Sequence, residues 1–437
     1  MPTFALLTFG CKVNQYDSQA IREALARRGY TEAADSASAD LYVVNTCCVT
    51  AESHRKGLRQ VRRLARRHPQ ASIVVTGCSV DADAEAIRKM PGVRCVVAND
   101  EKPLLDAIVA GQADTASAAA SPAPAWPAVS AFEGHTRAFV KIEDGCDDFC
   151  SYCIVPHVRG RVRSRPPDEV VDEVRRLVAN GYLEVVLTGI HLGAYGKETH
   201  GEWALLPLLE QLVGIPGLAR LRLSSLELRE VRDELIAFVA ASDALCPHFH
   251  IPLQSGDDAV LRAMNRRYTA ADFLARVEAI RGRLPDAALT TDVIVGFPAE
   301  TDEQFRNSLA TARRAAFSRM HVFPYSHREG TAAERMDGKL PKDVVDARRH
   351  AMQAVAAELA ETYHRRFVGR DIDVLVETRR DRRTGLLCGY SARYVRAFFQ
   401  GGDELMGSIV RVQATDADAR GVAASLPGGH PTLTARG

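Results

Sequence analysis

The sequence contains no apolar run that approaches the roughly 18 residues needed to cross a bilayer. Its first residues, MPTFALLTFGCKVNQ, lack the basic stretch and the small-residue cleavage site of a signal peptide. The net charge is only +1 and 46% of the residues are hydrophobic, a balance that disordered chains do not have. The sequence therefore predicts a globular protein that stays in the cytoplasm and has no membrane partner.

Cysteine is present in ten positions of the chain. The cytoplasm is reducing, which disfavours structural disulfides and favours metal binding as the role of clustered thiols. Six of the ten cysteines fall into such clusters, described below. Cys95, Cys246 and Cys388 lie in strand-like or barrel-like segments and are expected to be packing thiols.

The length of 437 residues exceeds what one hydrophobic core supports and indicates two or three domains. In residues 1–112, short apolar runs alternate with helical patterns, as in a parallel sheet flanked by helices. Residues 113–133, rich in Ala, Ser and Pro, are predicted to be a linker. The predicted strands are Phe4–Thr8, Leu41–Val44, Ile73–Val75 and Val93–Val97, and the predicted helices are Ser18–Arg28, Ala51–Arg67 and Asp83–Met90.

Residues 134–365 contain six strand-like runs separated by helical stretches, which predicts an open, partial (βα)6 barrel. The runs are AFVKIED, EVVLTGI, RLRLSSLE, PHFHIPLQ, LTTDVIVGF and MHVFPYS. Lys342–Arg366 has the composition of one long helix. Residues 366–428 alternate apolar and polar positions around Gly and Asp turns, which predicts a small antiparallel β-barrel. The fold class is therefore α/β, with a small all-β domain at the C-terminal end.

Basic residues are concentrated in three segments despite the near-neutral total. Each segment alone is typical of a solvated surface, whereas three of them favour a partner with a phosphate backbone. The segments contain His54, Arg55, Lys56, Arg59, Arg62, Arg63, Arg66, Arg67 and His68; Arg159, Arg161, Arg163 and Arg165; and Arg379, Arg380, Arg382 and Arg383.

Cys146, Cys150 and Cys153 form a C-x3-C-x2-C motif just after the first strand of the predicted barrel. Three thiolates on one loop can hold three irons of a cubane and leave the fourth iron open. The open iron can chelate S-adenosylmethionine, which one electron then cleaves to a 5′-deoxyadenosyl radical. Tyr152 offers a flat face for an adenine, although packing is an equally good reason for an aromatic residue there. The alternative for the motif is a zinc site completed by His157.

The motifs of the chain resemble those of the radical S-adenosylmethionine methylthiotransferases over nearly the whole length. GCKVNQYDSQ, NTCCVT and TGC resemble the three motifs of that family's auxiliary cluster, around Cys11, Cys47 and Cys78. The resemblance implies a second [4Fe-4S] cluster, which carries or passes on the inserted sulfur. All three cysteines follow successive predicted parallel strands, whose carboxyl ends meet at one edge of a sheet. Cys48 departs from the family pattern, and we assign Cys47 because adjacent strand residues point to opposite faces.

The central segments LTGIHLGAYG, RLSSLE, HIPLQSG, DVIVGFPAE and FPYSHREGTAA resemble those that shape the family's cofactor pocket. By that resemblance, Thr188 and Gly189 approach the amino group of S-adenosylmethionine. Glu227, Gln254 and Ser255 would meet its ribose or methionine end. For each of these residues a satisfied polar group at a strand end is an equal alternative. The C-terminal barrel resembles a TRAM domain, an RNA-binding module, and its basic turn at 379–383 agrees with phosphate contacts.

Three branches of this family differ in substrate. GCKVN, NTCCVT and RLSSLE resemble the branch that acts on N6-threonylcarbamoyladenosine in tRNA, whereas the isopentenyladenosine branch more usually has GCQMN and the ribosomal-protein aspartate branch GCPKN. The resemblance implies methylthiolation of C2 of threonylcarbamoyladenosine at position 37 of tRNA. It further implies two molecules of S-adenosylmethionine, an anticodon stem-loop as partner and a reducing electron donor.

Two hypotheses of other classes remain open at this point. The first is a non-catalytic RNA-binding protein with structural or redox-sensing iron–sulfur clusters, and the second is a zinc-bearing scaffold. Purely structural clusters usually have four protein ligands, whereas this chain offers two sets of three cysteines. The ligand number therefore favours an enzyme.

Overall fold

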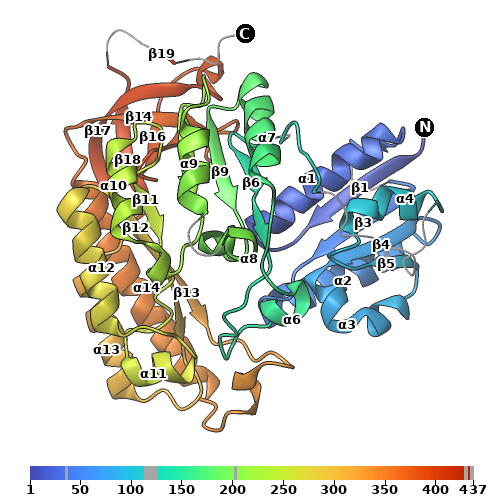
Figure 1. The fold of residues 1–437 in the computed structure, drawn as a ribbon, viewed down its shortest axis with the longest axis horizontal. Coiled ribbons are helices and arrows are strands. Elements are labelled where there is room, and N and C mark those ends of the chain that lie inside the picture. The colour runs from blue at the N-terminus through green and yellow to red at the C-terminus, as the bar shows by residue number, and fades with distance from the viewer. Residues whose placement is uncertain (35–37, 113–125, 133, 201–203, 428–431, 434–437) are drawn as a thin grey trace.

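The structure is a computed structural model that describes all residues except 35–37, 113–125, 133, 201–203, 428–431 and 434–437 (Figure 1). Most of the predicted linker, residues 113–125, lies outside the described residues. The part of that segment that is described packs against the central barrel, with Val129 and Phe132 buried in its core. No helix among the described residues is both long and apolar enough to span a bilayer.

Five parallel strands form the N-terminal sheet, in the order β2-β1-β3-β4-β5 (Figure 1). Helices α1 and α4 cover one face through a core that includes Phe4 and Val43, and helices α2 and α3 cover the other through Tyr42 and Val75. The predicted parallel sheet is confirmed. The strands are β1 (Thr3–Thr8), β2 (Thr31–Glu32), β3 (Leu41–Thr46), β4 (Ser72–Gly77) and β5 (Val93–Val97), and the helices are α1 (Lys12–Arg27), α2 (Ala51–Arg67), α3 (Cys78–Arg88) and α4 (Leu105–Val109).

Helix α1 begins at Lys12, well before the start predicted at Ser18. Asn14 and Asp17 are polar but fully or almost fully buried, because this side of α1 packs against other protein groups. Because these buried positions are polar, the first turns of α1 lack the apolar periodicity from which the start of a helix is predicted. Cys11 is the N-cap residue of α1, and Cys78 is the first residue of α3, so two cysteines occupy helix amino termini.

The central barrel has six parallel strands in the order β6-β9-β10-β11-β12-β13, as predicted. Isolated bridges join β10 and β11, whereas β6 and β13 do not pair over the described residues, so the barrel is open. The strands are β6 (Ala138–Lys141), β9 (Glu184–Thr188), β10 (Arg220–Leu223), β11 (His248–His250), β12 (Ala288–Val295) and β13 (Arg319–Pro324). The main helices are α7 (Pro167–Ala179), α9 (Leu205–Val213), α10 (Asp233–Ala241), α11 (Asp258–Ala263), α12 (Ala270–Arg283) and α13 (Asp302–Ala315).

The two faces of the barrel strands differ in polarity. Residues such as Val185, Leu221 and Val293 pack into one large apolar core together with residues of the helices around the barrel. Their strand neighbours point the other way, because successive strand residues alternate between faces. This second face, called the inner face below, is lined by polar side chains, among them Lys141, Glu184, Arg222, His248, His250, Asp292 and His321.

The C-terminal domain follows the long helix α14 (Lys342–Arg365). Strands β14, β15, β16, β18 and β17 pair in that order, and β14 also pairs with β17, which closes a five-stranded barrel as predicted for a TRAM domain. Main-chain carbonyl groups of this barrel accept hydrogen bonds from Arg220 and Arg222 of β10. The strands are β14 (Asp371–Val376), β15 (Leu387–Ser391), β16 (Arg396–Phe399), β17 (Ile409–Asp418), β18 (Gly421–Ser425) and β19 (Thr432–Leu433).

A buried ionic cluster joins the N-terminal domain to the central barrel. The Asp17 carboxylate of α1 lies 2.8 Å from Lys102 Nζ and 2.6 Å from Lys141 Nζ of β6. Arg159 Nη2 lies 3.6 Å from the same carboxylate. Burial opposes ionisation of Asp17, but the three cations outweigh it and hold the pKa of Asp17 below its usual range. A single carboxylate thus neutralises cations from both domains.

Asp17→Asn is expected to lower the free energy of unfolding by about 3–5 kcal/mol, because it removes the counterion of the buried Lys102 and leaves Lys141 and Arg159 to share Asp144. Urea unfolding followed by circular dichroism measures the effect. Asp172→Asn is the matched control, since Asp172 pairs with Arg175 at the surface, where both side chains are about two-thirds exposed. That variant should change stability by less than about 1 kcal/mol. Equal effects of the two substitutions would contradict the assigned role of Asp17.

Candidate functional site

Cys146, Cys150 and Cys153 lie on the loop that follows β6 and β7 (Glu143–Asp144). Two main-chain hydrogen bonds shape the loop: Cys146 N–H donates to Gly160 O and Cys153 N–H donates to Cys150 O. Burial, followed by the nearby charges of Cys150 and Cys146, raises the pKa of Cys153 to about 12. Deprotonation of these neighbouring thiols is unfavourable unless a cation binds the sulfurs, so the residue types of the trio are suited to an iron cluster.

Two further groups contact the sulfur atoms of this trio. Arg266 Nη1 lies 3.3 Å from Cys150 Sγ, and His191 Nδ1 lies 3.6 Å from Cys146 Sγ. His191 Nε2 also lies 2.5 Å from a carboxylate oxygen of Glu230. Burial opposes the protonation of His191, yet its hydrogen bonds to Cys146 and Glu230 raise its pKa to about 11. Both contacts are donors to thiolate sulfur, and donors of this kind orient ligands and tune a cluster.

His157, the residue weighed for a zinc site, belongs to no group of converging ligand atoms in the described part of the chain. It is exposed and lies against the ring of Phe149, with ring centroids 5.7 Å apart. The imidazole at the cysteines is instead that of His191, which with Cys146 and Asp148 forms a group of potential ligand atoms within 4.8 Å of one another. His191 lies in the LTGIHLGAYG segment, but spacing alone did not assign it.

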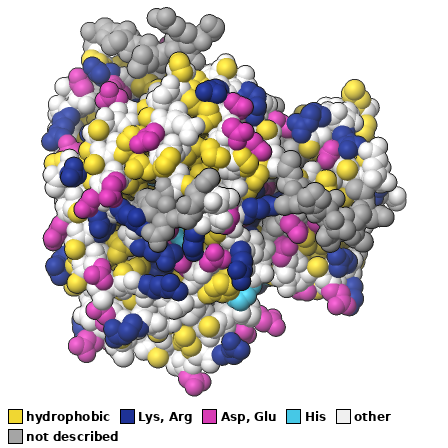
Figure 2. Space-filling model, viewed as in Figure 1, with side chains coloured by type: hydrophobic (Ala, Val, Ile, Leu, Met, Phe, Trp, Pro, Cys, Tyr) yellow, Lys and Arg dark blue, Asp and Glu magenta, His cyan; other side chains and the backbone are white. Residues whose placement is uncertain are grey.

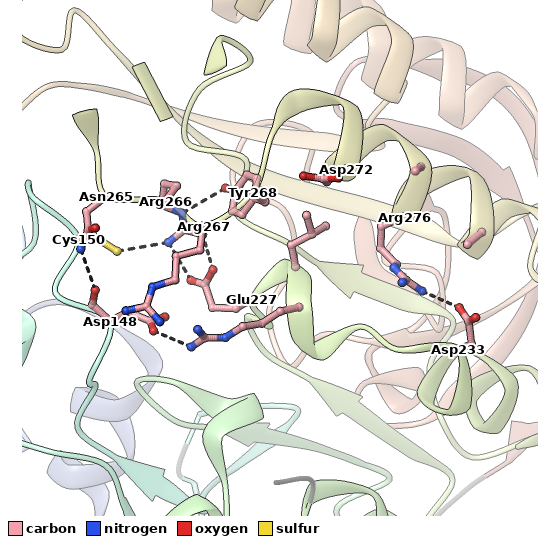
Figure 3. Close-up of a pocket in the computed structure, with 14 residues that line it drawn as sticks. Asp148, Cys150, Glu227, Asp233, Asn265, Arg266, Arg267, Tyr268, Asp272 and Arg276 are labelled. Carbon is pink, nitrogen blue, oxygen red and sulfur yellow. Dashed lines mark hydrogen bonds and ion pairs between the residues drawn. The ribbon is translucent and has the colours of Figure 1, made fainter. Parts of the chain in front are cut away.

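A pocket of about 470 Å³ opens beside Cys150 (Figure 3). Glu227 points into it and forms an ion pair with Arg266, whose Nη1 lies 3.1 Å from Glu227 Oε1. Arg266 therefore bridges the cysteine loop and Glu227, as the dashed lines in Figure 3 show. The pocket is lined by both charged and apolar groups, which suits a zwitterionic ligand with an adenine ring.

Thr188 and Gly189 stand at the carboxyl end of β9, opposite Glu143. A Cβ atom at Gly189 would lie 2.6 Å from Glu143 Oε2, so glycine is required for this carboxylate to approach the strand. Glu143 Oε2 accepts a hydrogen bond from His191 N–H at 2.7 Å, whereas Glu143 Oε1 is buried without a partner among the described residues. Burial holds the pKa of Glu143 well above its usual range. An orphaned buried carboxylate oxygen next to the trio fits the ammonium group of S-adenosylmethionine.

The other residues expected to contact the cofactor lie in three different settings. Tyr152 is half-buried and packs against an apolar cluster that contains Val260 and Phe297. Gln254 has a positive φ of 61°, and its side-chain amide makes no hydrogen bond within the described part of the chain. Ser255 is fully buried, and its hydroxyl lies 3.2 Å from that of Ser308. Of these three side chains, Gln254 and Tyr152 have polar groups without a hydrogen bond within the described part of the chain.

Cys11, Cys47 and Cys78 lie together at the carboxyl edge of the N-terminal sheet. Burial raises the pKa of Cys47 to about 12, and the charges of Cys11 and Cys78 act in the same direction. A Cβ atom at Gly10 would lie 2.8 Å from Cys47 Sγ, so this glycine lets the Cys11 loop close onto Cys47. The charges of Cys11 and Cys78 act on Cys47, so the three thiols are neighbours, and three neighbouring cysteines are suited to a cluster with three protein ligands.

Cys48 lies closer to the trio than strand alternation implies. The strand β3 ends at Thr46, so the alternation of side chains does not extend to Cys47 and Cys48. The Cys48 thiol is fully buried and forms a hydrogen bond with the Cys78 sulfur, which lowers the pKa of Cys78. Ile154 and Val158 of the central domain cover the pair.

Arg159 joins Cys78 of the N-terminal trio to Asp144, which precedes Cys146 of the central trio by two residues. Its Nε donates to Cys78 Sγ at 3.2 Å, its Nη1 to Asp144 at 2.8 Å and its Nη2 to Asn14 at 2.6 Å. The side chain is only 1% exposed, and that of Arg165 only 2%. The prediction of a phosphate-contacting segment at 159–165 is therefore wrong for these two arginines, which are buried in ion pairs.

Comparison with known families gives two matches along the chain. Residues 3–98 match the model described as uncharacterized protein family UPF0004, and residues 140–312 match the radical SAM superfamily. A radical S-adenosylmethionine methyltransferase from Kitasatospora setae, TsrM, has a similar fold: its TM-score is 0.56 at 18% sequence identity, over 74% of this chain and 73% of that one. This second likeness concerns the fold alone.

Two relatives align with most of the chain. Threonylcarbamoyladenosine tRNA methylthiotransferase MtaB of Bacillus subtilis is 36% identical over 94% of this chain and 94% of its own length. The tRNA-2-methylthio-N(6)-dimethylallyladenosine synthase of Desulfitobacterium hafniense is 34% identical over 94% of this chain and 95% of its own length. The chain therefore belongs to the radical S-adenosylmethionine tRNA methylthiotransferases, transferases that use S-adenosylmethionine and two [4Fe-4S] clusters.

Proposed function

We propose that this enzyme adds a methylthio group to C2 of N6-threonylcarbamoyladenosine at position 37 of tRNA, in the cytoplasm. The two relatives compared above differ in substrate but hardly in identity, at 36% and 34%. Identity alone therefore does not separate a threonylcarbamoyl group from a dimethylallyl group. The two groups differ in charge, since the first ends in a carboxylate and the second is a hydrocarbon.

Lys12 is the observation that carries this proposal. Its side chain is half-buried, and no described residue forms an ion pair or hydrogen bond with its ammonium group. Burial lowers the pKa of Lys12; the charge of Tyr394 partly opposes this shift, and that of Arg222 adds to it. A cation in this position gains stability from an anionic ligand and loses it next to a hydrocarbon. The GCKVN motif places this lysine where GCQMN has an uncharged glutamine.

The two cysteine trios have separate roles in the proposed reaction. We propose that Cys146, Cys150 and Cys153 hold the cluster that binds S-adenosylmethionine, and that Cys11, Cys47 and Cys78 hold the cluster that supplies sulfur. When bound, these groups supply a one-electron cleavage of S-adenosylmethionine and a methylthio donor. Glu143 would hold the amino group of the cofactor, Glu227 and Gln254 would meet its polar ends, and Arg266 and His191 would orient the ligating sulfurs.

The tRNA partner is supported by cations that remain exposed. Figure 2 shows Lys and Arg side chains gathered toward the middle of one face. We propose that the exposed cations of α2 and of the turn at 379–383 contact the phosphates of an anticodon stem-loop. Bases of such a loop can be splayed out to reach the barrel. The exposed members are Arg55, Lys56, Arg59, Arg62, Arg63, Arg66, Arg67, Arg379, Arg382 and Arg383.

Nucleoside mass spectrometry of tRNA from a deletion strain tests the proposal. The methylthio form of threonylcarbamoyladenosine should disappear, while other methylthio nucleosides stay unchanged. Complementation with Lys12→Gln should lower the rate of methylthiolation by about 10- to 100-fold, since a hydrogen bond to a charged group contributes about 1.5–3 kcal/mol. Lys89→Gln is the matched control, because Lys89 pairs with Glu85 at the surface.

Two results would contradict the proposal. Loss of the methylthio form of isopentenyladenosine, with the threonylcarbamoyl form intact, would assign the enzyme to the dimethylallyl branch. Loss of a methylthiolated ribosomal-protein aspartate would move the substrate from RNA to protein. If Lys12→Gln and Lys89→Gln supported equal rates, Lys12 would have no part in recognising the substrate.

A further inference from the structure

His250, Asp292 and His321 lie side by side on the inner face of the barrel, outside both cysteine trios. They belong to three adjacent strands, β11, β12 and β13. The register pairs Asp292 with His321 directly, and it pairs His250 with Thr290, two residues before Asp292. All three side chains therefore project from the same face of the sheet.

The potential ligand atoms of these residues converge. His321 Nδ1 lies 3.0 Å from Asp292 Oδ1, and His250 Nε2 lies 3.4 Å from Asp292 Oδ2. One ligand atom from each residue can be chosen so that all lie within 4.8 Å of one another. Donors about 2.1 Å from a shared ion are at most about 4.2 Å apart, so small side-chain rotations would bring all three onto one ion.

The second nitrogen of His250 is fixed by the protein. His250 Nδ1 lies 2.9 Å from the hydroxyl oxygen of Thr290, whose position in β12 is set by the sheet. The same hydroxyl lies 3.0 Å from His248 Nε2, and His250 Nε2 faces the Asp292 carboxylate, to which it donates when no ion is bound. When an ion displaces that proton, the Thr290 hydroxyl can accept from Nδ1 and keep the Nε2 lone pair directed at the ion. An imidazole held through its far nitrogen in this way is typical of metal ligands in proteins.

The cluster is accessible, unlike the His191 and Glu230 pair. The His321 side chain is 43% exposed and that of Asp292 27%, whereas the His191 and Glu230 pair near Cys146 is almost fully buried. An ion can therefore reach the cluster from the inner face. Its remaining coordination positions would face the same space and accept water or an oxygen ligand.

We propose that His250, Asp292 and His321 form a binding site for one divalent first-row transition-metal ion. Two imidazoles and one carboxylate on one side of an ion, with the other positions open, suit Fe²⁺, Mn²⁺, Co²⁺ or Zn²⁺ rather than Ca²⁺ or Mg²⁺, which prefer oxygen ligands. The site uses none of the six cysteines assigned to the clusters. It is separate from the proposed choice of tRNA substrate, so either proposal can fail alone.

Titration of the holoenzyme with Mn²⁺ tests this site. Mn²⁺ is chosen because its free form has a strong EPR signal at room temperature, whereas oxidised [4Fe-4S] clusters are diamagnetic. The wild type should bind one Mn²⁺ per chain, seen as loss of the free signal. Asp292→Asn removes the ligand charge at nearly constant shape and should weaken binding by more than about 100-fold, and Thr290→Val should weaken it by about 10-fold.

His327→Gln is the matched control, because it removes an exposed histidine that lies 3.6 Å from Glu334 and should bind Mn²⁺ as the wild type does. Iron content and circular dichroism report whether each variant is folded. If Asp292→Asn loses iron, His321→Gln takes its place, since the half-exposed His321 is less important for packing. Absence of saturable Mn²⁺ binding in the wild type, or equal affinity in the folded ligand variants, would overturn the proposal.

Discussion

Cys150→Ala is expected to abolish the formation of 5′-deoxyadenosine from S-adenosylmethionine. Removal of one thiolate leaves two protein ligands for a cluster that needs three, and Arg266 then faces an uncharged methyl group instead of sulfur. Substitution of a residue that hydrogen-bonds to a metal ligand typically lowers metal affinity or activity by about 10- to 100-fold. Loss of a ligand itself should therefore reduce the rate of cofactor cleavage by more than about 100-fold. Chromatography of the products of reductive cleavage measures the effect.

The N-terminal cluster should survive in the same variant. Its three cysteines belong to another domain, so iron content should fall from about eight to about four atoms per chain. Cys95→Ala is the matched control, since this half-buried thiol lies on β5 and packs against the apolar core beneath α1 and α4. It should keep both the iron and the cleavage activity. Cofactor cleavage at the wild-type rate in Cys150→Ala would remove this loop from the radical reaction.

The strand pattern of the sequence was sufficient to predict the order of the elements. All six predicted barrel runs contain a strand, and the predicted helix Ala51–Arg67 has the same bounds as α2. Such apolar runs can be predicted from the sequence because the strands of a parallel sheet are buried under the helices that connect them. The proximity of the cysteines within each trio could also be predicted from short segments of the sequence. The central three lie on one loop, and the other three follow successive parallel strands.

The partners of the cysteines could not be predicted in the same way. Arg159 and Arg161 both lie in a basic segment, yet Arg159 is buried against Cys78 while Arg161 is exposed. Arg266 reaches Cys150 from more than a hundred residues away. Such contacts depend on how separate elements pack, which hydrophobic periodicity does not encode. The same holds for His250 and Asp292, which become neighbours only when β11 and β12 pair.

Cys47→Ala is expected to leave 5′-deoxyadenosine formation intact and to stop methylthio transfer to tRNA. Cys47 faces Cys11 and Cys78, and its buried thiol has a pKa raised to about 12 by burial and by these neighbours. Bound iron stabilises the deprotonated thiol and so offsets the free-energy cost of ionising it in a buried position. Cys47→Ala removes this ligand from the iron. Iron analysis, cofactor cleavage and nucleoside mass spectrometry should then give half the iron, normal cleavage and product lowered by more than about 100-fold.

Cys48→Ala decides between the two neighbouring cysteines. The Cys48 thiol donates to the sulfur of Cys78 and is covered by Ile154, which makes it a partner of a ligand in our assignment. Its removal should therefore keep all the iron and weaken methylthio transfer by no more than about 10- to 100-fold, the range for outer-shell partners of a metal site. Because β3 ends at Thr46, strand geometry does not force this outcome. Loss of the auxiliary cluster in Cys48→Ala but not in Cys47→Ala would make Cys11, Cys48 and Cys78 the ligand set.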